Sequence, residues 1–260
     1  MKLPERIEEL LAGENYRLDS VGLSASTVCL FQDKVLKIQD ATEEATGEFK
    51  MLQWLQGKLK VPQIIAREIR DGKQFLLMRK LEGTMSCDDG FMLQPALQTR
   101  LLARGLKALW AVDVADCPVD RSLDWKLEAA RCNVEHGLVD LDNVEPGTFG
   151  KGGFADPAAL LQWLYDHRPP EEPVLSHGDY SLPNIFFSGE EVGYLDLGRT
   201  GIADKWCDIA LCYRSLSRNY SGRYHGKAYS GLDDQLLFQE LGLAPDWEKI
   251  RYYILLDELF

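Results

Sequence analysis

The segment from Leu175 to Gly198 constrains the possible folds of this chain more than any other part of the sequence. It contains an aspartate at position 179, an asparagine five residues later and a second aspartate twelve residues beyond that. Short apolar runs surround all three, with the composition of buried strands. A surface loop has no reason to combine this order, spacing and flanking pattern. We therefore interpret the segment as part of an active site.

The three polar side chains, Asp179, Asn184 and Asp196, match the needs of phosphoryl transfer. A fixed carboxylate at position 179 can accept the proton of an attacking hydroxyl. The amide and the second carboxylate are hard oxygen donors, which Mg²⁺ prefers, and Mg²⁺ takes its other ligands from phosphates and water. Each residue alone also fits a turn, a cap or a strand end. Their order in one segment favours the catalytic interpretation.

The composition is that of an acidic, folded protein. The 260 residues, 45% of them hydrophobic, suffice for one large domain or for two lobes that share a cleft. The formal net charge of −12 argues against a nucleic-acid partner, which needs a basic face, and would attract a cationic small molecule. The sequence shows no transmembrane run, no secretory signal and no Cys-x-x-Cys pair. We therefore expect a cytoplasmic protein with reduced thiols and no membrane partner.

Hydrophobic periodicity predicts two lobes of different character. The first has strands over residues 17–20, 27–32, 35–39, 64–69 and 75–78, the last two joined by a turn at Asp71-Gly72, with helices over 4–11 and 43–55. The second has helices over residues 93–114, 123–133, 157–167, 204–216 and 247–260, strand character only within 174–197, and a loop over 139–153. The predicted fold class is α+β, with a small antiparallel β-rich lobe (1–80), a hinge (81–83) and a larger, mainly helical lobe (84–260).

Lys37 is the candidate cation of the first lobe, because a charged residue in an apolar strand needs a partner. Glu48, on the following predicted helix, is well placed to supply one. Such a pair can direct an ammonium group at nucleotide phosphates. The alternative is a lysine that faces water from a half-exposed strand.

Three further features each permit two interpretations. The small residues from Gly22 to Thr27 would let backbone amides approach a phosphate, but they also fit an ordinary β-turn. The ending Asp257-Glu258-Leu259-Phe260 joins two acids to the terminal carboxylate, and it is either a trap for ammonium groups or a frayed tail. His177 precedes Gly178 at a strand edge, where we expect it to bond backbone carbonyls rather than to act as a base.

Together these residues resemble the aminoglycoside 3′-phosphotransferases, antibiotic-resistance kinases with a protein-kinase-like fold. The resemblance rests on His177-Gly178-Asp179 with Asn184, on Asp196-Leu197-Gly198-Arg199, on Ile202-Ala203-Asp204-Lys205-Trp206 and on the Asp-Glu-Leu-Phe ending. It covers nearly the whole chain. The first two motifs occur in many small-molecule kinases, whereas the Gly-Arg-x-Gly-x-Ala-Asp block and the ending are more specific.

The resemblance implies a role for each matching residue. Asp179 is implied to be the catalytic aspartate, and Asn184 and Asp196 are implied to bind Mg²⁺. The nucleotide would be bound by Lys37 with its partner Glu48, by Ser24 over the β-phosphate, by the hinge at Arg79 and Leu81, and by Val35, which stands where one branch has an aromatic ring over adenine. The substrate contacts implied are Arg199, Asp257, Glu258 and the carboxylate of Phe260.

The implied reaction is transfer of the γ-phosphate of ATP, or alternatively GTP, to the 3′-hydroxyl of a drug such as kanamycin. The implied partner is a cationic aminoglycoside, and the protein would be a monomer or a weak dimer. Leu182 stands where some members have an acid, and the substrate contacts within 135–153 and 217–234 cannot be assigned by position. The alternatives are a kinase for another small alcohol (a macrolide, choline or a sugar) and an inactive nucleotide or drug binder. A protein kinase is disfavoured, because little room for an activation segment follows Asp196.

Overall fold

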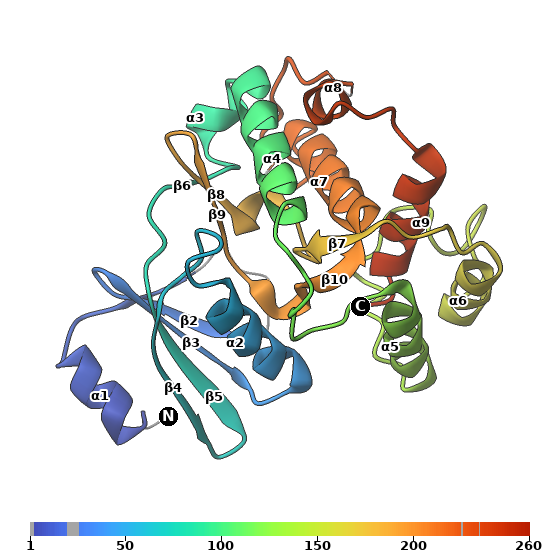
Figure 1. Ribbon diagram of the computed structural model, residues 1–260. Helices are drawn as coiled ribbons and strands as arrows, with labels where there is room; N and C mark the ends of the chain where they lie inside the picture. The colour runs from blue at the N-terminus through green and yellow to red at the C-terminus, as the bar shows by residue number, and fades with distance from the viewer. Residues whose placement is uncertain (1–2, 20–25, 225, 234) are drawn as a thin grey trace.

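A computed structural model describes residues 3–19, 26–224, 226–233 and 235–260 (Figure 1). An antiparallel sheet with two helices forms one part of the molecule, and a mainly helical assembly forms the other. This architecture confirms the predicted α+β class. The first part consists of α1 (Glu5–Leu11), β1 (Arg17–Leu18), β2 (Thr27–Leu30), β3 (Lys34–Asp40), α2 (Glu43–Leu55), β4 (Ile64–Arg70) and β5 (Lys73–Arg79).

The five strands pair in the order β1-β2-β3-β5-β4, so β3 and β5 are central. The turn between β4 and β5 falls at Asp71 and Gly72, both with positive φ, as the sequence predicts for a tight hairpin. Alternate residues of β5 face opposite sides. Phe75 and Leu77 belong to a small core that includes residues of α1, whereas Leu76 and Met78 join α2 in the main core. The sheet is therefore covered on both faces.

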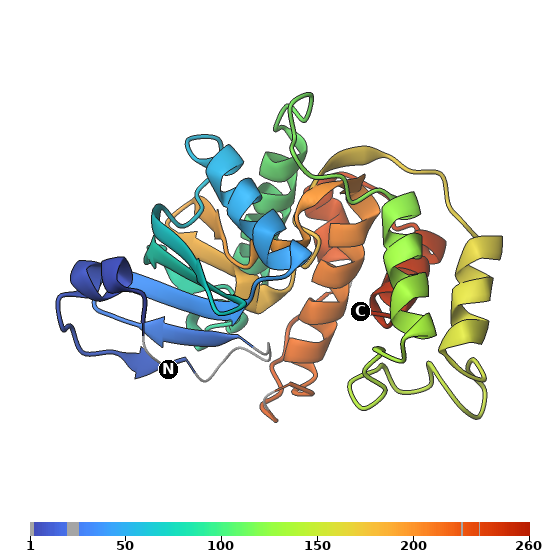
Figure 2. The same ribbon diagram turned by 90° about the horizontal axis from the view of Figure 1, so that it is seen from below.

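The second part supplies most of the main core. Its helices are α3 (Asp89–Met92), α4 (Pro95–Trp110), α5 (Leu123–Glu135), α6 (Pro157–Asp166), α7 (Lys205–Tyr220), α8 (Leu236–Leu241) and α9 (Trp247–Asp257). Its short strands are β6 (Thr84–Met85), β7 (Pro173–Ser176), β8 (Ile185–Ser188), β9 (Glu191–Tyr194) and β10 (Gly201–Asp204). From below, α7 lies beside α9 (Figure 2).

The predicted elements are present, but several boundaries and short elements differ. The predicted helix over 93–114 is shorter, because Pro95 begins α4 and the helix ends at Trp110. The helix predicted over 204–216 continues to Tyr220 as α7. The segment 174–197 divides into β7, β8 and β9 with two 3₁₀ turns, η1 (Leu182–Asn184) and η2 (Leu197–Arg199). The elements α3, β6 and α8 were not predicted, since a few residues do not show a periodic pattern.

Two short sheets position the segment singled out from the sequence. β7 pairs with β10, and β8 pairs with both β6 and β9, all antiparallel. The loop from β7 to β8 and the turn after β9 therefore come together.

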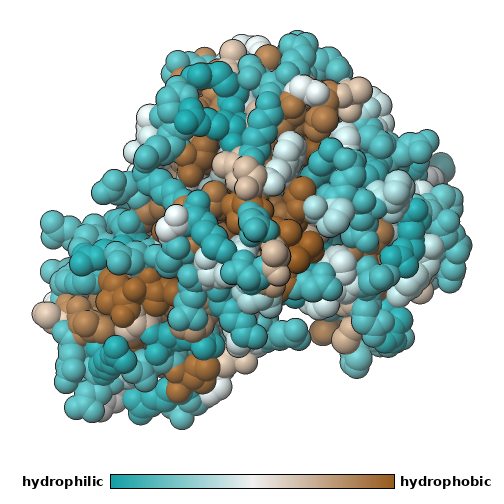
Figure 3. Space-filling view, in the orientation of Figure 1, coloured by the Kyte–Doolittle hydropathy of each residue, from teal (hydrophilic) through white to brown (hydrophobic). Residues whose placement is uncertain are grey.

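The side of the molecule seen in Figure 3 is largely hydrophilic, with apolar areas over the sheet part and at the centre. In the part of the chain that the structure describes, no helix combines the length and apolar character needed to span a membrane.

Helix α4 contacts this segment through a glycine. The buried hydroxyls of Tyr180 and Tyr194 donate to the carbonyl oxygens of Leu102 and Gly105, at 2.9 and 2.8 Å. A Cβ atom at Gly105 would overlap the Tyr180 hydroxyl and come within 2.8 Å of a methyl carbon of Val192. Glycine therefore permits the close approach of α4 to the two tyrosines.

We predict that Gly105→Ala destabilises the protein, although the same change inside a helix ordinarily stabilises. Overpacking should lower the free energy of unfolding by about 1–3 kcal/mol, measured by urea denaturation. In a Tyr180→Phe background the loss should be smaller, because the overlapping hydroxyl is gone. An equal loss in both backgrounds would show that Tyr180 is not the obstacle.

Candidate functional site

Lys37, on β3, lies between two carboxylates from distant parts of the chain. Its Nζ is 2.8 Å from Oε1 of Glu48, on α2, and 2.8 Å from Oδ1 of Asp196, in the turn after β9. Gln39 Nε2 donates to the other oxygen of Glu48 at 2.8 Å. Lys37 therefore does not face water, and its ion pairs connect the sheet part to the helical part.

The electrostatics of this cluster keep Lys37 charged. Burial opposes its charge, but Glu48 and Asp196 together outweigh that effect and hold the pKa of Lys37 above its usual value. Burial likewise opposes ionisation of Asp196, but the charge of Lys37 prevails and lowers the pKa of that carboxyl. Lys37 and Asp196 are therefore an ammonium–carboxylate pair at neutral pH.

Asp179 and Asn184 lie together in the loop between β7 and β8. The Nδ2 atom of Asn184 donates to Oδ2 of Asp179 at 2.8 Å, to its backbone oxygen at 3.1 Å and to Ser181 Oγ at 3.1 Å. These bonds fix the carboxylate of Asp179. Because they occupy the nitrogen of the Asn184 amide, its Oδ1 atom remains available as a ligand.

Asp196 has a left-handed backbone, with φ of 56° and ψ of 65°. That conformation is uncommon for a residue other than glycine and is concentrated at functional sites. The Asp196 side chain is 44% exposed, and only Oδ1 is bonded to Lys37. Among the residues that the structure describes, none bonds the second carboxylate oxygen, which leaves it available to bind a cation.

The donor set fits Mg²⁺. Across residues 3–19, 26–224, 226–233 and 235–260, no three His, Cys, Asp or Glu side chains form a metal-binding group. Mg²⁺ does not require one, since it commonly takes one or two protein oxygens and completes its shell with phosphates and water. Asn184 Oδ1 and Asp196 would be those two protein ligands.

Gly178 allows the loop between β7 and β8 to approach the turn after β9. It has φ of 83°, and a Cβ atom there would overlap the carbonyl oxygen of Arg199. Thr200 Oγ1 also donates to the backbone oxygen of His177, at 2.9 Å. The glycine of the His-Gly-Asp motif is thus required by both its backbone conformation and the contact.

Asp208, on α7, supports this loop and was missed by the sequence analysis. Its carboxylate is buried and accepts the backbone N–H groups of His177 and Gly178, at 2.7 and 2.9 Å. Burial raises the pKa of this carboxyl despite these bonds. A buried aspartate on the apolar side of a helix needs hydrogen-bond partners. The position of Asp208 among apolar residues of the predicted helix was therefore the sequence signal for its supporting role.

His177 connects the loop to the turn. Its Nε2 is 2.8 Å from the backbone oxygen of Leu195, and its Nδ1 accepts the backbone N–H of Asp179 at 3.3 Å. Both ring nitrogens therefore contact the backbone, in the structural role expected of this histidine.

The remaining nucleotide candidates fall into two groups. Val35 is half-buried on β3, where it lies opposite Met78 of β5. Arg79 is the last residue of β5 and forms an ion pair with Asp33. The side chain of Leu81 packs beside Gly193. Val35 and Arg79 lie at the same end of the paired strands β3 and β5. This is the end from which the chain continues into the helical part of the molecule. Ser24 lies outside the described residues.

The C-terminal acids are docked rather than frayed. Asp257 pairs with Arg199, Nη1 to Oδ1 at 3.0 Å, and with Arg214. Glu258 pairs with Arg214 at 3.3 Å. Asn133 Nδ2 donates to the backbone oxygen of Leu259 at 2.9 Å. The end of the chain is thus fixed against α5 and α7.

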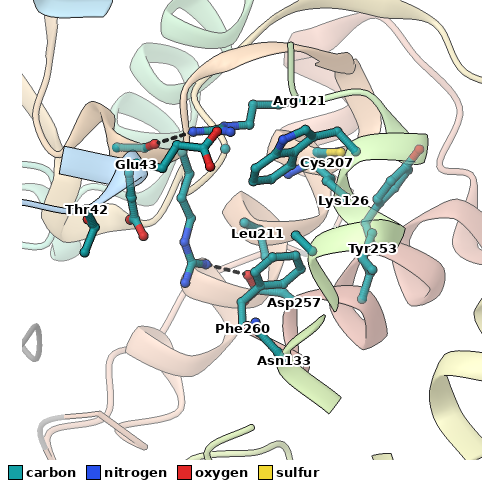
Figure 4. Close-up of a pocket in the computed structure, with 17 residues that line it drawn as sticks. Thr42, Glu43, Arg121, Lys126, Asn133, Cys207, Leu211, Tyr253, Asp257 and Phe260 are labelled. Carbon is teal, nitrogen blue, oxygen red and sulfur yellow. Dashed lines mark hydrogen bonds and ion pairs between the residues drawn. The ribbon is translucent and has the colours of Figure 1, made fainter. Parts of the chain in front are cut away.

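The Arg199–Asp257 pair borders a cavity of about 360 Å³ (Figure 4). Phe260 also lines it, so the cavity brings together three of the four predicted substrate residues. Arg121 closes another side and donates to the backbone oxygen of Gly198 at 3.2 Å. The fourth residue, Glu258, lies beside Asp257 and faces Arg214 instead.

We predict that Glu258 makes stability depend on pH. Burial raises the pKa of its carboxyl from 4.5 to about 7; Arg214 opposes the rise and Asp257 adds to it. Between these values the folded protein holds a proton that the unfolded chain has released, so the contribution of Glu258 to stability falls as pH rises. The free energy of unfolding of the wild type minus that of Glu258→Gln should fall between about pH 4.5 and 7 and level off above. A constant or rising difference, measured by urea denaturation, would contradict this assignment.

Comparison with known proteins places the chain in a family. A family model described as the phosphotransferase enzyme family matches residues 16–253. Among curated proteins, an aminoglycoside 3′-phosphotransferase of Campylobacter jejuni is 37% identical over 241 residues, covering 90% of this chain and 89% of the relative. One of Enterococcus faecalis is 36% identical over 275 residues, covering 100% and 99%.

A solved structure agrees with the sequence matches. The crystal structure of an aminoglycoside 3′-phosphotransferase of type VIII has a TM-score of 0.81 and 25% sequence identity, covering 98% of this chain and 97% of that one. The family resemblance and the predicted kinase-like fold are thereby confirmed. The chain belongs to the phosphotransferase enzyme family.

Proposed function

We propose that this protein transfers the γ-phosphate of ATP to the 3′-hydroxyl of an aminoglycoside such as kanamycin. The observation that carries the proposal is the placement of Lys37 between Glu48 and Asp196, with Asp179 and Asn184 on the adjoining loop. Relatives with the name aminoglycoside 3′-phosphotransferase, 36–37% identical over 90% or more of this chain, support the choice of substrate.

In this proposal residues 1–80 form a nucleotide-binding lobe, 81–83 a hinge, and 84–260 the lobe for catalysis and substrate binding. Val35, Arg79 and Leu81 lie where the adenine would meet the hinge. Lys37, kept cationic by its two carboxylates, would neutralise phosphate oxygens. GTP is the alternative donor.

Asn184 and Asp196 would hold Mg²⁺, which would offset charge on the phosphates when bound. Asp179 orients the substrate hydroxyl and accepts its proton. The bond from Asn184 holds this carboxylate in place, so little ordering remains to be done when the substrate binds. His177 is not a candidate base, because both of its ring nitrogens contact the backbone.

The substrate would bind near Arg199, Asp257, Glu258 and the carboxylate of Phe260. Since Asp257 and Glu258 are paired with arginines, an ammonium group of the drug must share these carboxylates or displace a guanidinium. The reaction would place a phosphate where the drug has a ribosome-contacting hydroxyl, and resistance would follow. A cytoplasmic monomer or weak dimer is part of this proposal.

The direct test is a substrate panel with purified protein, Mg²⁺ and ATP. Release of ADP should depend on kanamycin, and NMR of the product should locate the phosphate on the 3′-oxygen. Choline, a macrolide and simple sugars should give no ADP above background. Turnover with one of these alone would replace the proposed substrate, and the absence of aminoglycoside-dependent ADP release would refute the activity.

We predict that Asp179→Ala lowers kcat for kanamycin by about 10²–10⁴, because the hydroxyl loses its proton acceptor. Titration with a fluorescent ATP analogue should show nucleotide affinity close to that of the wild type. Asp166→Ala, at the end of α6 and away from the loop, is the matched control and should retain turnover. Near-normal kcat in Asp179→Ala would refute its role as base.

A further inference from the structure

The last residue of the chain forms part of the cavity wall. Phe260 lines the cavity that Arg199 and Asp257 border, and the guanidinium carbon of Arg199 lies 5.6 Å from the centre of the Phe260 ring. The ends of most chains are poorly ordered unless another part of the fold ties them down. A terminal carboxylate can therefore act as a fixed ligand only if the backbone that carries it is held.

The terminal carboxylate differs from the two neighbouring acids in its partners. Asp257 is paired with Arg199 and Arg214, and Glu258 is paired with Arg214. No residue that the structure describes forms an ion pair with the carboxylate of Phe260. An ammonium group can therefore bind this carboxylate without displacing a guanidinium group of the described chain.

The hydrogen bonds that α9 itself gives to the chain end are long. The backbone N–H groups of Leu259 and Phe260 donate to carbonyl oxygens of the preceding turn, each at 3.2 Å. This distance is at the upper end of the usual range for such bonds. The ends of helices commonly fray, so these two bonds alone hold the terminal residue weakly.

Asn133, on α5, supplies a support from a different part of the fold. Its Nδ2 atom donates to the backbone oxygen of Leu259 at 2.9 Å. Among the described residues, no other hydrogen bond joins the backbone of residues 257–260 to an element outside α9 and its last turn. Asn133 and Phe260 both line the cavity (Figure 4).

The bonded carbonyl fixes the orientation of the last peptide group. Because a peptide group is planar, a restraint on the Leu259 oxygen also restrains the nitrogen and Cα atoms of Phe260. Only rotations about the two backbone bonds of Phe260 then remain between this support and the terminal carboxylate. The amide of Asn133 thus limits where that carboxylate can lie.

We propose that Asn133 is a positioning residue for the substrate, because it holds the terminal carboxylate of Phe260 in the cavity. This inference rests on the proposed function, in which that carboxylate meets an ammonium group of the aminoglycoside. Asn133 orders the chain end in advance, so the drug does not have to immobilise it on binding. The sequence does not single out Asn133, since its partner is 126 residues away.

The first test measures how firmly the chain end is held, without any substrate. Carboxypeptidase A removes aromatic residues from accessible chain ends, so the rate of Phe260 release, followed by mass spectrometry, reports the population of the detached end. Asn133→Leu removes the donor at similar volume, and Asn133→Asp replaces it with a carboxylate that only accepts. Both variants should release Phe260 about two- to tenfold faster, as expected for the loss of one hydrogen bond. Release at the wild-type rate in both would overturn the inference.

The matched control is Glu128→Gln, on the same helix. Glu128 pairs with Arg131 rather than with the chain end. The control should therefore equal the wild type in Phe260 release and in kinetics, and urea denaturation should show all variants to be folded.

The second test connects the anchored end to the substrate. Asn133→Leu should raise KM for kanamycin by about two- to tenfold, with KM for ATP unaltered. The same substitution is then made in a protein with Gly-Ser-Gly-Ser added after Phe260, which moves the terminal carboxylate away. There the substitution should change KM for kanamycin little, since Asn133 has no carboxylate left to position. Equal rises in both backgrounds would show a merely structural role and overturn the inference.

The two tests separate this inference from the proposed function. If the wild type does not phosphorylate kanamycin, the proposed function is wrong, and Phe260 release still decides whether Asn133 holds the chain end. If turnover depends on kanamycin but neither release nor KM responds to the substitutions at Asn133, the inference alone is wrong.

Discussion

The ion pairs of Lys37 are the interaction on which the arrangement of the site depends. The ammonium group of Lys37, on a central strand, contacts Glu48 of helix α2 and Asp196 in the turn after β9. Glu48 is 11 residues away from Lys37 in the sequence, whereas Asp196 is 159 residues away. The Lys37–Glu48 pair is buried, so removing either partner should be strongly destabilising, since it leaves a charge without compensation. The same lysine also links strand β3 to the proposed metal ligand, Asp196.

The proposed functional residues Asp179, Asn184 and Asp196 lie on short loops and turns. Hydrogen bonds from buried polar groups hold these segments in place. Asp208 binds two backbone amides of the His-Gly-Asp motif, and His177 connects that motif to Leu195, next to Asp196. Two tyrosine hydroxyls connect the same segment to α4. Preorganisation of this kind reduces the ordering that the reaction would otherwise require.

The sequence was sufficient for features with a local signal. The spacing of Asp179, Asn184 and Asp196, the hairpin at Asp71 and Gly72, and the pairing of Lys37 with Glu48 could each be inferred from neighbouring residues. Asp208 and the elements α3, β6 and α8 were missed, because a supporting aspartate on a helix and elements of a few residues have weak local patterns. The C-terminal acids illustrate a different limit. Their abundance suggested an open acidic trap, but their partners Arg199 and Arg214 are more than 40 residues distant, and only the fold brings them together.

The most direct measurement of the central claim is calorimetric titration of ATP, with and without Mg²⁺, into the wild type and Asp196→Asn. Asparagine tolerates the left-handed backbone at this position, so the substitution removes charge with little backbone strain. If Asp196 holds the metal against the phosphates, Mg²⁺ should increase ATP affinity in the wild type, and most of that gain should be absent in the variant. The same gain in both proteins would contradict the proposed metal site and the phosphoryl-transfer chemistry built on it.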